Sequence, residues 1–518
     1  MSKLRDPKAQ TPPAPQTPER EGEAAGSRLA LLRYGGELTT KASATRRRFV
    51  KQLVKNLKDA LASEGIPGRV ERTHNRLYVE THGPGDLAVL ARCFGLQSVS
   101  IVEPHPFQTL EDVVEIGFER FREAVRDRRF AVRARRVGEK AGVPFGSQDL
   151  ARALGARLDT VARRVDLSDP EFTVYVELEP GRAYFFSETM KAEGGLPLGV
   201  EGRAVSLVSG GFDSAVASWM LLKRGVGLDY VFCNLGGRSH QLGTLRVMKQ
   251  VADRWSYGQR PHLHAVDFDD VARELRERCE TRYWQIILKR LMLRAGEMIA
   301  RERRAQAIVT GEAVGQVSSQ TLQNLSVISE ATPLPILRPL IGFNKDEIIA
   351  IARHIGTEEL SRVVGEYCAM VPSKPATSAE LAVVVAEEER LDLSILERAV
   401  AERSVFDLRS LDLAKLDEPS LQIHSVPNGA TVIDLRSKPA FQAWHYPEAL
   451  HLDFANALRA YPSFDAEGHY VLYCEFGLKS AHLAELMRER GLSAHHFAGG
   501  LKELLDHARE RGIPTPER

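Results

Sequence analysis

The hexapeptide Ser209–Ser214, with the sequence Ser-Gly-Gly-Phe-Asp-Ser, constrains the fold more than any other part of the chain. It follows the apolar run 204–208 and precedes the apolar run 215–222, which predicts a strand, a glycine turn and a helix start. Backbone N–H groups and the helix dipole make such a turn attractive to anions, and small residues let a phosphate approach the backbone. The sequence therefore predicts a nucleotide phosphate site in an α/β domain.

The glycines are not followed by Lys-Ser or Lys-Thr, so the hexapeptide is not the usual P-loop. The pattern Ser-Gly-Gly-x-Asp-Ser instead resembles the PP-loop of ATP pyrophosphatases. This resemblance implies an enzyme that adenylates a carbonyl oxygen with ATP and releases pyrophosphate. The alternative is an ordinary strand-to-helix turn that is rich in small residues.

The 518-residue chain is long enough for several domains. Its formal net charge is only +1, so any nucleic-acid surface must be a local patch. Residues 1–27 are polar and proline-rich, which predicts a disordered tail and not a signal peptide. No apolar stretch is long enough to span a bilayer, so we expect no membrane partner and a cytoplasmic location.

Strand and helix patterns, with the breaker cluster 194–197, divide the remainder into four α/β domains. Alternating strands and helices in the third domain predict a doubly wound, mostly parallel sheet. The predicted ranges are 28–82, 83–192, 193–402, a linker at 403–420, and 421–518.

Residues outside the hexapeptide are expected to complete the ATP site. Strand ends border the ligand crevice in this fold class, so Phe232 and Cys233 are predicted to line an adenine pocket without taking part in chemistry. Asp213 is predicted to act in catalysis by positioning a Mg²⁺ ion that bridges the ATP phosphates.

Basic side chains supply candidate partners for the phosphates. Lys289 and Arg290 fall on a predicted helix at 284–300, for which a solvated helix face is an equal alternative, and Lys345 is a further candidate. The complete set of predicted ATP-binding residues is Leu207, Val208, Ser209, Gly210, Gly211, Phe212, Ser214, Phe232, Cys233, Lys289, Gly311, Gln320 and Lys345.

The five cysteines, at positions 93, 233, 279, 368 and 474, are scattered, and none forms a Cys-x-x-Cys pair. This spacing argues against a structural metal site, and a sparse, odd set favours a reducing compartment. Cys93 and Cys279 lie in helical patterns and are interpreted as structural residues.

Cys474 differs because it directly follows the predicted strand 470–473 and precedes a helix start. Backbone N–H groups of the loop 474–479 and the helix end are expected to stabilise a thiolate or a persulfide. Together with Val432–Arg436, His445–Ala449 and Ala498–Leu501, this loop resembles a rhodanese domain, which implies a sulfur-carrying cysteine. A buried cysteine at a strand end is the alternative.

Cys368, in the third domain, is the predicted partner of Cys474 in a transient disulfide. A single free cysteine is usually a small core residue. The presence of a PP-loop and a rhodanese-like loop in the same chain favours the catalytic interpretation.

Basic clusters at 41–48 and 118–140 predict an RNA surface, and Phe118, Phe121 and Phe130 alternate with arginines in the second. Basic side chains engage phosphates with salt-dependent affinity, although a solvated helix face is the more common explanation for any one arginine. The predicted RNA-binding residues are Lys41, Arg46, Arg47, Arg48, Arg128, Arg129, Arg133 and Arg135.

The segment Arg33–Leu38, followed by Lys41 and Arg46–Phe49, resembles the start of the tRNA 4-thiouridine synthetases, the ThiI-type tRNA sulfurtransferases. Segments 144–147 and 174–177 fit the THUMP domain of that family. The resemblance covers nearly everything after residue 27. It implies a multidomain α/β protein with a ferredoxin-like α+β domain, a THUMP domain, a doubly wound PP-loop domain and a rhodanese-like domain.

The family resemblance also implies an activity and its partners. ATP would adenylate a uridine of tRNA, expected at position 8, and sulfur from a Cys474 persulfide would replace the activated oxygen. A cysteine desulfurase would load Cys474, and the family also allows a homodimer and sulfur donation to a thiazole-synthesis carrier protein. The alternatives are a sulfur donor for thiamine synthesis only and a non-catalytic RNA-binding protein.

Overall fold

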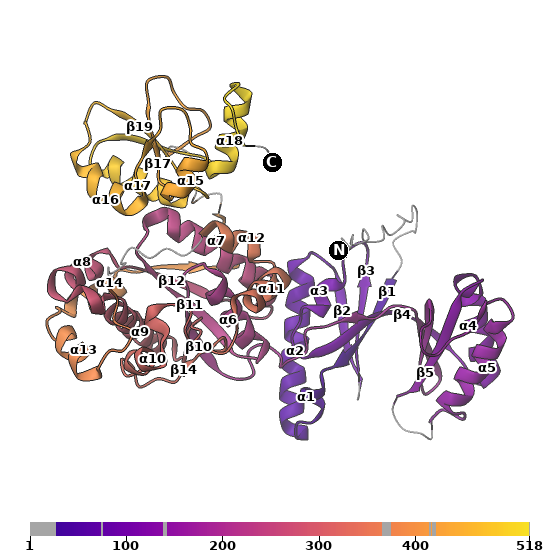
Figure 1. Ribbon diagram of the computed structural model, residues 1–518. Coiled ribbons are helices and arrows are strands. Elements are labelled where there is room, and N and C mark those ends of the chain that lie inside the picture. Colours follow the sequence, from indigo (N-terminus) through magenta and orange to yellow (C-terminus); the bar gives the residue numbers. More distant parts are fainter. Residues whose placement is uncertain are drawn as a thin grey trace, which may run out of the picture. The chain divides into compact units, whose positions relative to one another are not determined.

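The structure is a computed structural model that describes residues 27–73, 76–137, 142–364, 374–413, 416 and 421–516. Within these ranges the strands form three sheets, labelled in Figure 1. No helix in the described ranges has both the length and the apolar character to cross a membrane. The chain divides into two compact units, one with Leu61–Leu87 and Ser100–Thr189 plus the chain up to Leu31, the other with Leu32–Ala60, Ala88–Val99 and Met190–Arg518.

The first sheet contains, among the described residues, β1 (Ser27–Tyr34), β2 (Gly68–Arg72), β3 (Leu77–His82), β4 (Leu96–Pro106), β5 (Arg129–Arg136), β6 (Arg164–Val165), β7 (Phe172–Glu179), β8 (Arg182–Phe186) and β9 (Met190–Lys191). Its order is β2-β3-β1-β4-β8-β7-β5-β6, with β9 paired to β4. β5 and β7 are parallel, whereas β7 and β8 are antiparallel. These three strands belong to the predicted second domain, the THUMP α/β domain, which therefore contains both parallel and antiparallel pairs.

Short and long helices accompany this sheet: α1 (Gly36–Thr39), α2 (Ser43–Ser63), α3 (Ala88–Ala91), α4 (Leu110–Val125) and α5 (Ser147–Asp159). Helix α4 begins with a capping box, in which the Thr109 hydroxyl accepts a hydrogen bond from the Asp112 backbone N–H and the Asp112 carboxylate accepts one from the Thr109 backbone N–H. The apolar faces of α4 and α5 share one buried cluster with β5 and β7, which includes Phe130 and Leu154.

The central sheet consists, as described, of β10 (Arg203–Leu207), β11 (Gly227–Asn234), β12 (His262–Asp267), β13 (Ile308–Val309), β14 (Ile336–Leu337) and β15 (Ser404–Asp407). The strand order is β14-β13-β10-β11-β12-β15, and all pairs except β12–β15 are parallel. The chain adds β11 and β12 on one side of β10 and then β13 and β14 on the other. The order therefore changes direction between β10 and β13.

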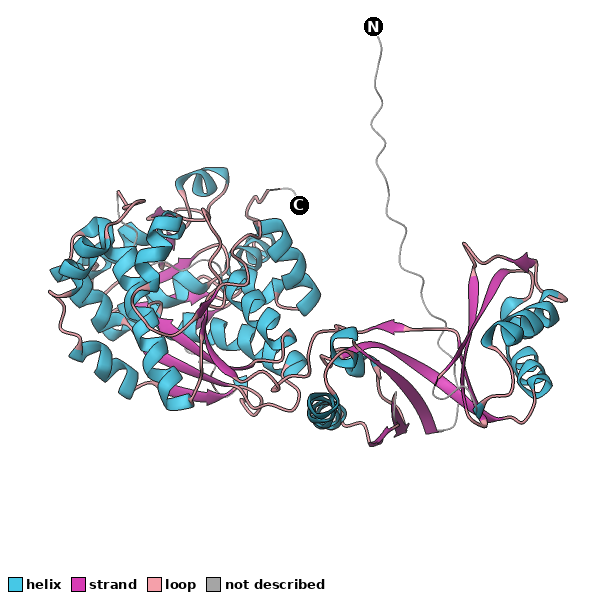
Figure 2. Ribbon diagram, turned by 90° about the horizontal axis from the view of Figure 1, so that it is seen from below, coloured by secondary structure: helices cyan, strands magenta, loops and turns pink. Residues whose placement is uncertain are grey.

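The helices of this region are α6 (Phe212–Lys223), α7 (Gly237–Trp255), α8 (Asp269–Arg278), α9 (Trp284–Arg303), α10 (Leu322–Ser329), α11 (Lys345–Ile355), α12 (Glu358–Val364), α13 (Leu381–Glu388) and α14 (Ser394–Ala401). They cover both faces of the sheet, as Figure 2 shows. Successive residues of β10 accordingly belong to different buried clusters, Ala204 to one and Val205 to the other. The predicted doubly wound sheet is confirmed.

The predicted linker at 403–420 begins with a strand of the central sheet. β15 pairs antiparallel with β12, with Val405 opposite His264 and Phe406 opposite Leu263. The strand is only four residues long, and Val405 is half exposed. So short an edge strand carries little hydrophobic periodicity, which is why the sequence does not predict it.

The third sheet contains, as described, β16 (Gln422–Ile423), β17 (Thr431–Asp434), β18 (Leu450–His451), β19 (His469–Tyr473) and β20 (Ser493–Phe497). All its pairs are parallel, in the order β16-β20-β19-β17-β18. It is accompanied by α15 (Lys438–Ala443), α16 (Phe454–Ala460), α17 (Leu478–Glu489) and α18 (Gly500–Glu510). Leu472 and Val471 of the central strand β19 belong to different buried clusters, so this sheet is also packed on both faces.

Candidate active site

A cavity of about 250 Å³ lies at the carboxyl ends of β10, β11 and β13. The strand order changes direction at this point, and open α/β sheets bind ligands in the crevice formed there. Ten residues predicted for the ATP site line it together: Leu207, Val208, Ser209, Asp213, Ser214, Phe232, Cys233, Lys289, Gly311 and Gln320.

The hexapeptide forms a compact turn between β10 and α6. The Ser214 hydroxyl donates to the Gly211 carbonyl at 3.1 Å and accepts from the Ser209 backbone N–H at 3.3 Å. Gly210 has a φ of +75°, a conformation that favours glycine. Gly311 packs against this turn so closely that a methyl group there would lie 2.7 Å from the Asp213 carbonyl carbon. These constraints fix the backbone that faces the cavity.

Asp213 is the centre of a polar network in the first turn of α6. Its carboxylate accepts hydrogen bonds from Lys345 Nζ at 3.0 Å and from Gln316 Nε2 at 2.9 Å. The Lys345 ammonium also lies 5.6 Å from the centre of the Phe212 ring. Lys345 and Phe212, like Gly210 and Gly211, adjoin the cavity without lining it. The sequence predicted Lys345 as a phosphate ligand, and the structure places it on the Asp213 carboxylate.

A buried ion network that the sequence did not predict forms another wall of the cavity. Glu312, which is 8% exposed, accepts hydrogen bonds from Lys289 at 2.9 Å, Arg338 at 2.8 Å and Thr310 at 3.1 Å. Burial alone would raise the pKa of Glu312, but the two cations outweigh burial and hold it below the usual value. Glu312 is therefore a fixed negative charge that orients Lys289.

Two other predicted residues, Arg290 and Cys233, differ in whether they face the cavity. Arg290 is 2% exposed, donates to the Val327 carbonyl and forms an ion pair with Glu388 at 2.8 Å, so it does not line the cavity. Lys289 and Arg290 are consecutive residues of α9, and consecutive residues point in different directions on a helix, so only Lys289 faces the cavity. Burial raises the pKa of the Cys233 thiol far above its usual range, which agrees with a lining role without chemistry.

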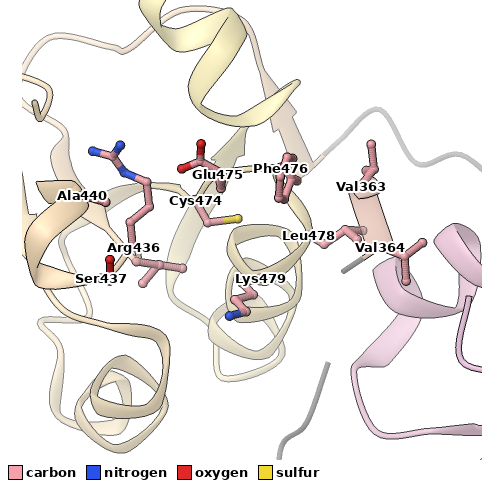
Figure 3. Close-up of a pocket in the computed structure, with 11 residues that line it drawn as sticks. Val363, Val364, Arg436, Ser437, Ala440, Cys474, Glu475, Phe476, Leu478 and Lys479 are labelled. Atoms are coloured by element: carbon pink, nitrogen blue, oxygen red, sulfur yellow. The ribbon is translucent and has the colours of Figure 1, made fainter. Parts of the chain in front are cut away.

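A second cavity, of about 330 Å³, surrounds Cys474 at the carboxyl end of β19 (Figure 3). The Cys474 thiol is 5% exposed, accepts a hydrogen bond from the Gly477 N–H at 3.2 Å and lies 3.6 Å from the Ser480 hydroxyl. Its sulfur points toward the side formed by Phe476 and Leu478. A donor N–H at a helix start is the arrangement that stabilises negative charge on sulfur.

A buried group of charges stabilises the strand ends beside Cys474. Asp434, fully buried at the end of β17, pairs with Arg436 at 2.6 Å and accepts a hydrogen bond from the Tyr473 hydroxyl at 2.6 Å. Arg436 also donates to the Trp444 carbonyl. Because Tyr473 directly precedes Cys474, this network fixes the backbone from which the thiol projects.

The predicted disulfide partner, Cys368, lies outside the described residues. The last described residues before it, Val363 and Val364 at the end of α12, form part of the wall of the Cys474 cavity (Figure 3). The described cysteines are all free. Burial raises the pKa of Cys279 to about 11 and that of Cys93 further, in agreement with the structural roles predicted for both.

The two basic clusters differ in how many of their charges are available. On α2, Arg47 and Arg48 are exposed, while Arg46 lies 5.7 Å from the centre of the Tyr34 ring, and Lys41 just before the helix is exposed. Near β5, Arg128 and Arg135 are exposed, and Arg133 donates to the Leu167 carbonyl.

Arg129 and the three phenylalanines of the second cluster are held within the fold. Arg129 is bound by three carboxylates, those of Asp166, Asp169 and Glu171, at 2.9–3.6 Å. Phe118, Phe121 and Phe130 are buried in the core rather than exposed between the arginines. Their spacing marks the apolar face of α4 and the inner face of β5, and it does not mark a stacking surface for bases.

The chain matches known protein families in the same four-part order as the predicted domains. Family models match four successive segments: the ThiI ferredoxin-like domain at 29–100, the THUMP domain at 108–188, thiamine biosynthesis protein (ThiI) at 199–393 and the rhodanese-like domain at 416–507. The ferredoxin-like match extends beyond residue 82, where we predict the end of the first domain.

Similar proteins match over most of their length. A tRNA sulfurtransferase of Pyrobaculum aerophilum is 38% identical over 477 residues, which cover 90% of this chain and 96% of the relative. One from Edwardsiella ictaluri is 34% identical over 473 residues, 89% of this chain and 98% of the relative. A crystal structure of a 4-thiouridine synthetase–RNA complex with bound ATP has 31% identity and a TM-score of 0.64, covering 74% of this chain and 99% of that chain.

The fold and its two cavities define a PP-loop protein that carries its own rhodanese-like sulfur domain. The chain belongs to the tRNA sulfurtransferase family.

Proposed function

We propose that this protein uses ATP to transfer sulfur from a persulfide on Cys474 to a uridine of tRNA, forming 4-thiouridine. The observation that carries the proposal is the presence, in one chain, of a cavity built on a PP-loop and a second cavity built around a thiol at a helix start. The first suits activation by a nucleotide, and the second suits storage of sulfur. The relatives named tRNA sulfurtransferase support tRNA as the substrate.

Activation takes place at the first cavity. The N–H groups at the start of α6 and the Lys289 ammonium bind ATP phosphates, while Phe232 and Cys233 border the base. The C4 oxygen of the uridine attacks the α-phosphorus, the bond to pyrophosphate breaks, and an O4-adenylated uridine forms. AMP is then a far better leaving group than the oxygen of the free base.

Asp213 suits a Mg²⁺ ion that accompanies the phosphates. Its carboxylate lines the cavity and accepts hydrogen bonds from Lys345 and Gln316, whose side chains are both partly exposed. An oxygen ligand of this kind is what Mg²⁺ prefers, and the ion would neutralise charge that develops on pyrophosphate. Asp213 would exchange its ammonium partner for the metal ion when the nucleotide binds.

Sulfur transfer begins from the terminal sulfur of the Cys474 persulfide, which a cysteine desulfurase supplies. That sulfur attacks C4, a C–S bond forms, and AMP leaves with the electrons of the C–O bond. The Cys368 thiolate then attacks the Cys474 sulfur, which releases thiouridine and leaves a Cys368–Cys474 disulfide. Alternatively, Cys368 attacks the persulfide first and releases sulfide as the nucleophile. In both routes a dithiol reductant resets the disulfide.

The position of Val364 supports Cys368 as the resolving residue. Val364 lies in the wall of the Cys474 cavity, and Cys368 follows it by four residues. Four residues of extended chain span at most about 14 Å, so the length of chain between Val364 and position 368 is compatible with the proposed reaction.

Several finer assignments belong to the same proposal. We place the modified uridine at tRNA position 8, the reaction in the cytoplasm and the predicted basic residues at the tRNA surface, with a homodimer as the expected assembly. The match to a family model described as thiamine biosynthesis protein (ThiI) favours a second role, sulfur donation to a thiazole-synthesis carrier protein.

The proposed function is tested by mass spectrometry of nucleosides from tRNA incubated with the protein, MgATP, cysteine and a cysteine desulfurase. We expect 4-thiouridine only when every component is present, together with one AMP per sulfur transferred. Thiolation without ATP, or ATP cleavage without thiolation, would contradict the proposal.

A further inference from the structure

Helix α7 contacts the PP-loop through two side chains that no predicted role explains. The buried His240 lies with its Nε2 3.1 Å from the Ser209 carbonyl, and its ring meets the Phe232 ring edge-on at 4.9 Å. One turn later, Thr244 packs against Gly210, where a methyl group would lie 2.9 Å from the threonine hydroxyl. Helix α7 therefore supports both the phosphate turn and the wall of the nucleotide cavity.

The N-terminus of the same helix contacts the rhodanese-like domain. The Arg238 backbone N–H donates to Glu485 of α17 at 3.1 Å, and the Arg238 guanidinium donates to the Leu416 carbonyl at 3.1 Å. A methyl group on Gly237 would lie 2.5 Å from His482 Nδ1 and 2.7 Å from Glu485 Oε2, so α7 and α17 are in close contact. Glu485 thereby caps the N-terminus of α7, where the first backbone N–H groups of a helix point beyond its end.

Apolar side chains next to these contacts, Val364 and Leu478, link the two cavities. A methyl group on Gly243 of α7 would lie 2.9 Å from Val364 and 3.8 Å from Leu478, and one on Gly210 would lie 3.0 Å from Val364. Leu478 follows the Cys474 loop directly and packs against the core of the central domain. Val364 thus touches the phosphate turn and also forms part of the wall of the Cys474 cavity (Figure 3).

We propose that helix α7 holds the rhodanese-like domain in the position from which Cys474 delivers its sulfur, with Glu485 and His482 as positioning residues. The proposal rests on the sulfur transfer proposed above and adds that delivery occurs within one chain, from the docked domain. The apolar wall formed by Val363, Val364 and Leu478 shields the persulfide on the side that faces the central domain. In the docked position Val364 contacts both the phosphate turn and the Cys474 cavity, so the sulfur need not diffuse between separate molecules.

The test compares the full-length protein with its Glu485→Lys variant in three assays. The first measures loading of Cys474 with sulfur by the desulfurase. The second measures thiolation of tRNA by free sulfide with MgATP, which bypasses Cys474. The third measures single-turnover thiolation from the preloaded persulfide. Glu510→Lys, on an exposed helix end of the same domain, is the matched control, and Glu485→Gln keeps a side-chain acceptor for the Arg238 N–H.

We expect Glu485→Lys to slow the persulfide-driven reaction by about 10-fold or more, because an ammonium repels the α7 N-terminus. Loading and sulfide-driven thiolation should stay within about twofold of the unchanged protein, and Glu485→Gln should restore most of the persulfide-driven rate. An unchanged persulfide-driven rate, or an equal loss in the sulfide-driven reaction, would overturn the docking role. Failure of the unchanged protein in both thiolation assays would instead refute the proposed function.

Discussion

The nucleotide cavity and the Cys474 cavity are similar in size but differ in what their polar groups do. The walls of the first, about 250 Å³, carry Asp213 and the ion-paired Lys289 and Glu312. The walls of the second, about 330 Å³, combine apolar side chains such as Val363 and Leu478 with charged ones around a single thiol, which accepts a hydrogen bond from a backbone N–H. Phosphates and a metal ion need fixed charges, whereas negative charge on sulfur is stabilised by backbone N–H groups at a helix start. The difference indicates that activation and sulfur storage need separate environments.

Removing Asp213 should have the largest effect, because both sulfur sources depend on activation. We expect Asp213→Ala to reduce thiolation of tRNA from persulfide and from free sulfide by roughly 100-fold or more. The exposed Asp346→Ala variant, at the start of α11, is the control. The measurement is tRNA-dependent release of pyrophosphate. A variant that still releases pyrophosphate normally would show that Asp213 does not serve activation.

Removing the Cys474 thiol should distinguish the function of its cavity from that of the nucleotide cavity. Cys474→Ala should lower persulfide-driven thiolation by more than about 100-fold but leave the sulfide-driven reaction within about threefold. Cys93→Ala, which removes a buried thiol elsewhere, should change neither rate. Equal loss of both reactions in Cys474→Ala would mean that the thiol also serves activation, and the division between the cavities would fail.

The charged wall of the nucleotide cavity can be tested by neutralising a pair of residues. Lys289→Met should raise the KM for ATP about 10-fold and lower the free energy of unfolding by about 1–3 kcal/mol, because Glu312 keeps only Arg338 as a cation. Adding Glu312→Gln should recover the stability without recovering the KM. If the double variant binds ATP normally, Lys289 acts only as a partner of Glu312.

The contact between helices α7 and α17, which includes His482, should weaken in acid. Burial, and to a lesser extent His240, lower the pKa of His482 to about 4, below the usual histidine value of 6.5. The folded state therefore favours neutral His482, and its contribution to stability is lost as the pH falls from 6.5 towards 4. Thermal unfolding of His482→Gln should show a smaller loss across this window, by on the order of 1–3 kcal/mol. Parallel curves would exclude His482 as a source of the pH dependence.

How much of this architecture the sequence predicts depends on whether the relevant pattern is local. The turn 209–214 and the Cys474 loop each lie within a few residues between a strand and a helix, so their roles follow from local pattern. The ion network of Lys289, Glu312 and Arg338 joins three separate elements, and nothing in a stretch such as Thr-Gly-Glu marks the glutamate as buried. No local pattern could predict that network.

Patterns that have two physical causes were the least informative. Alternating arginines and phenylalanines at 118–130 suit a surface on which bases stack as well as an amphipathic helix and strand, and burial of the phenylalanines excludes base stacking on these rings. The placement of Val364 between the phosphate turn and the Cys474 cavity depends on tertiary packing alone.

The central claim is that sulfur held on Cys474 reaches tRNA only through ATP activation in the same protein. It is tested most directly by loading Cys474 with radiolabelled sulfur, removing the donor and adding tRNA in a single turnover, with or without MgATP. The account predicts that the label moves from the protein into 4-thiouridine only with MgATP, with one AMP formed per labelled sulfur. Labelled 4-thiouridine formed without MgATP, or no labelled 4-thiouridine with it, would contradict the account.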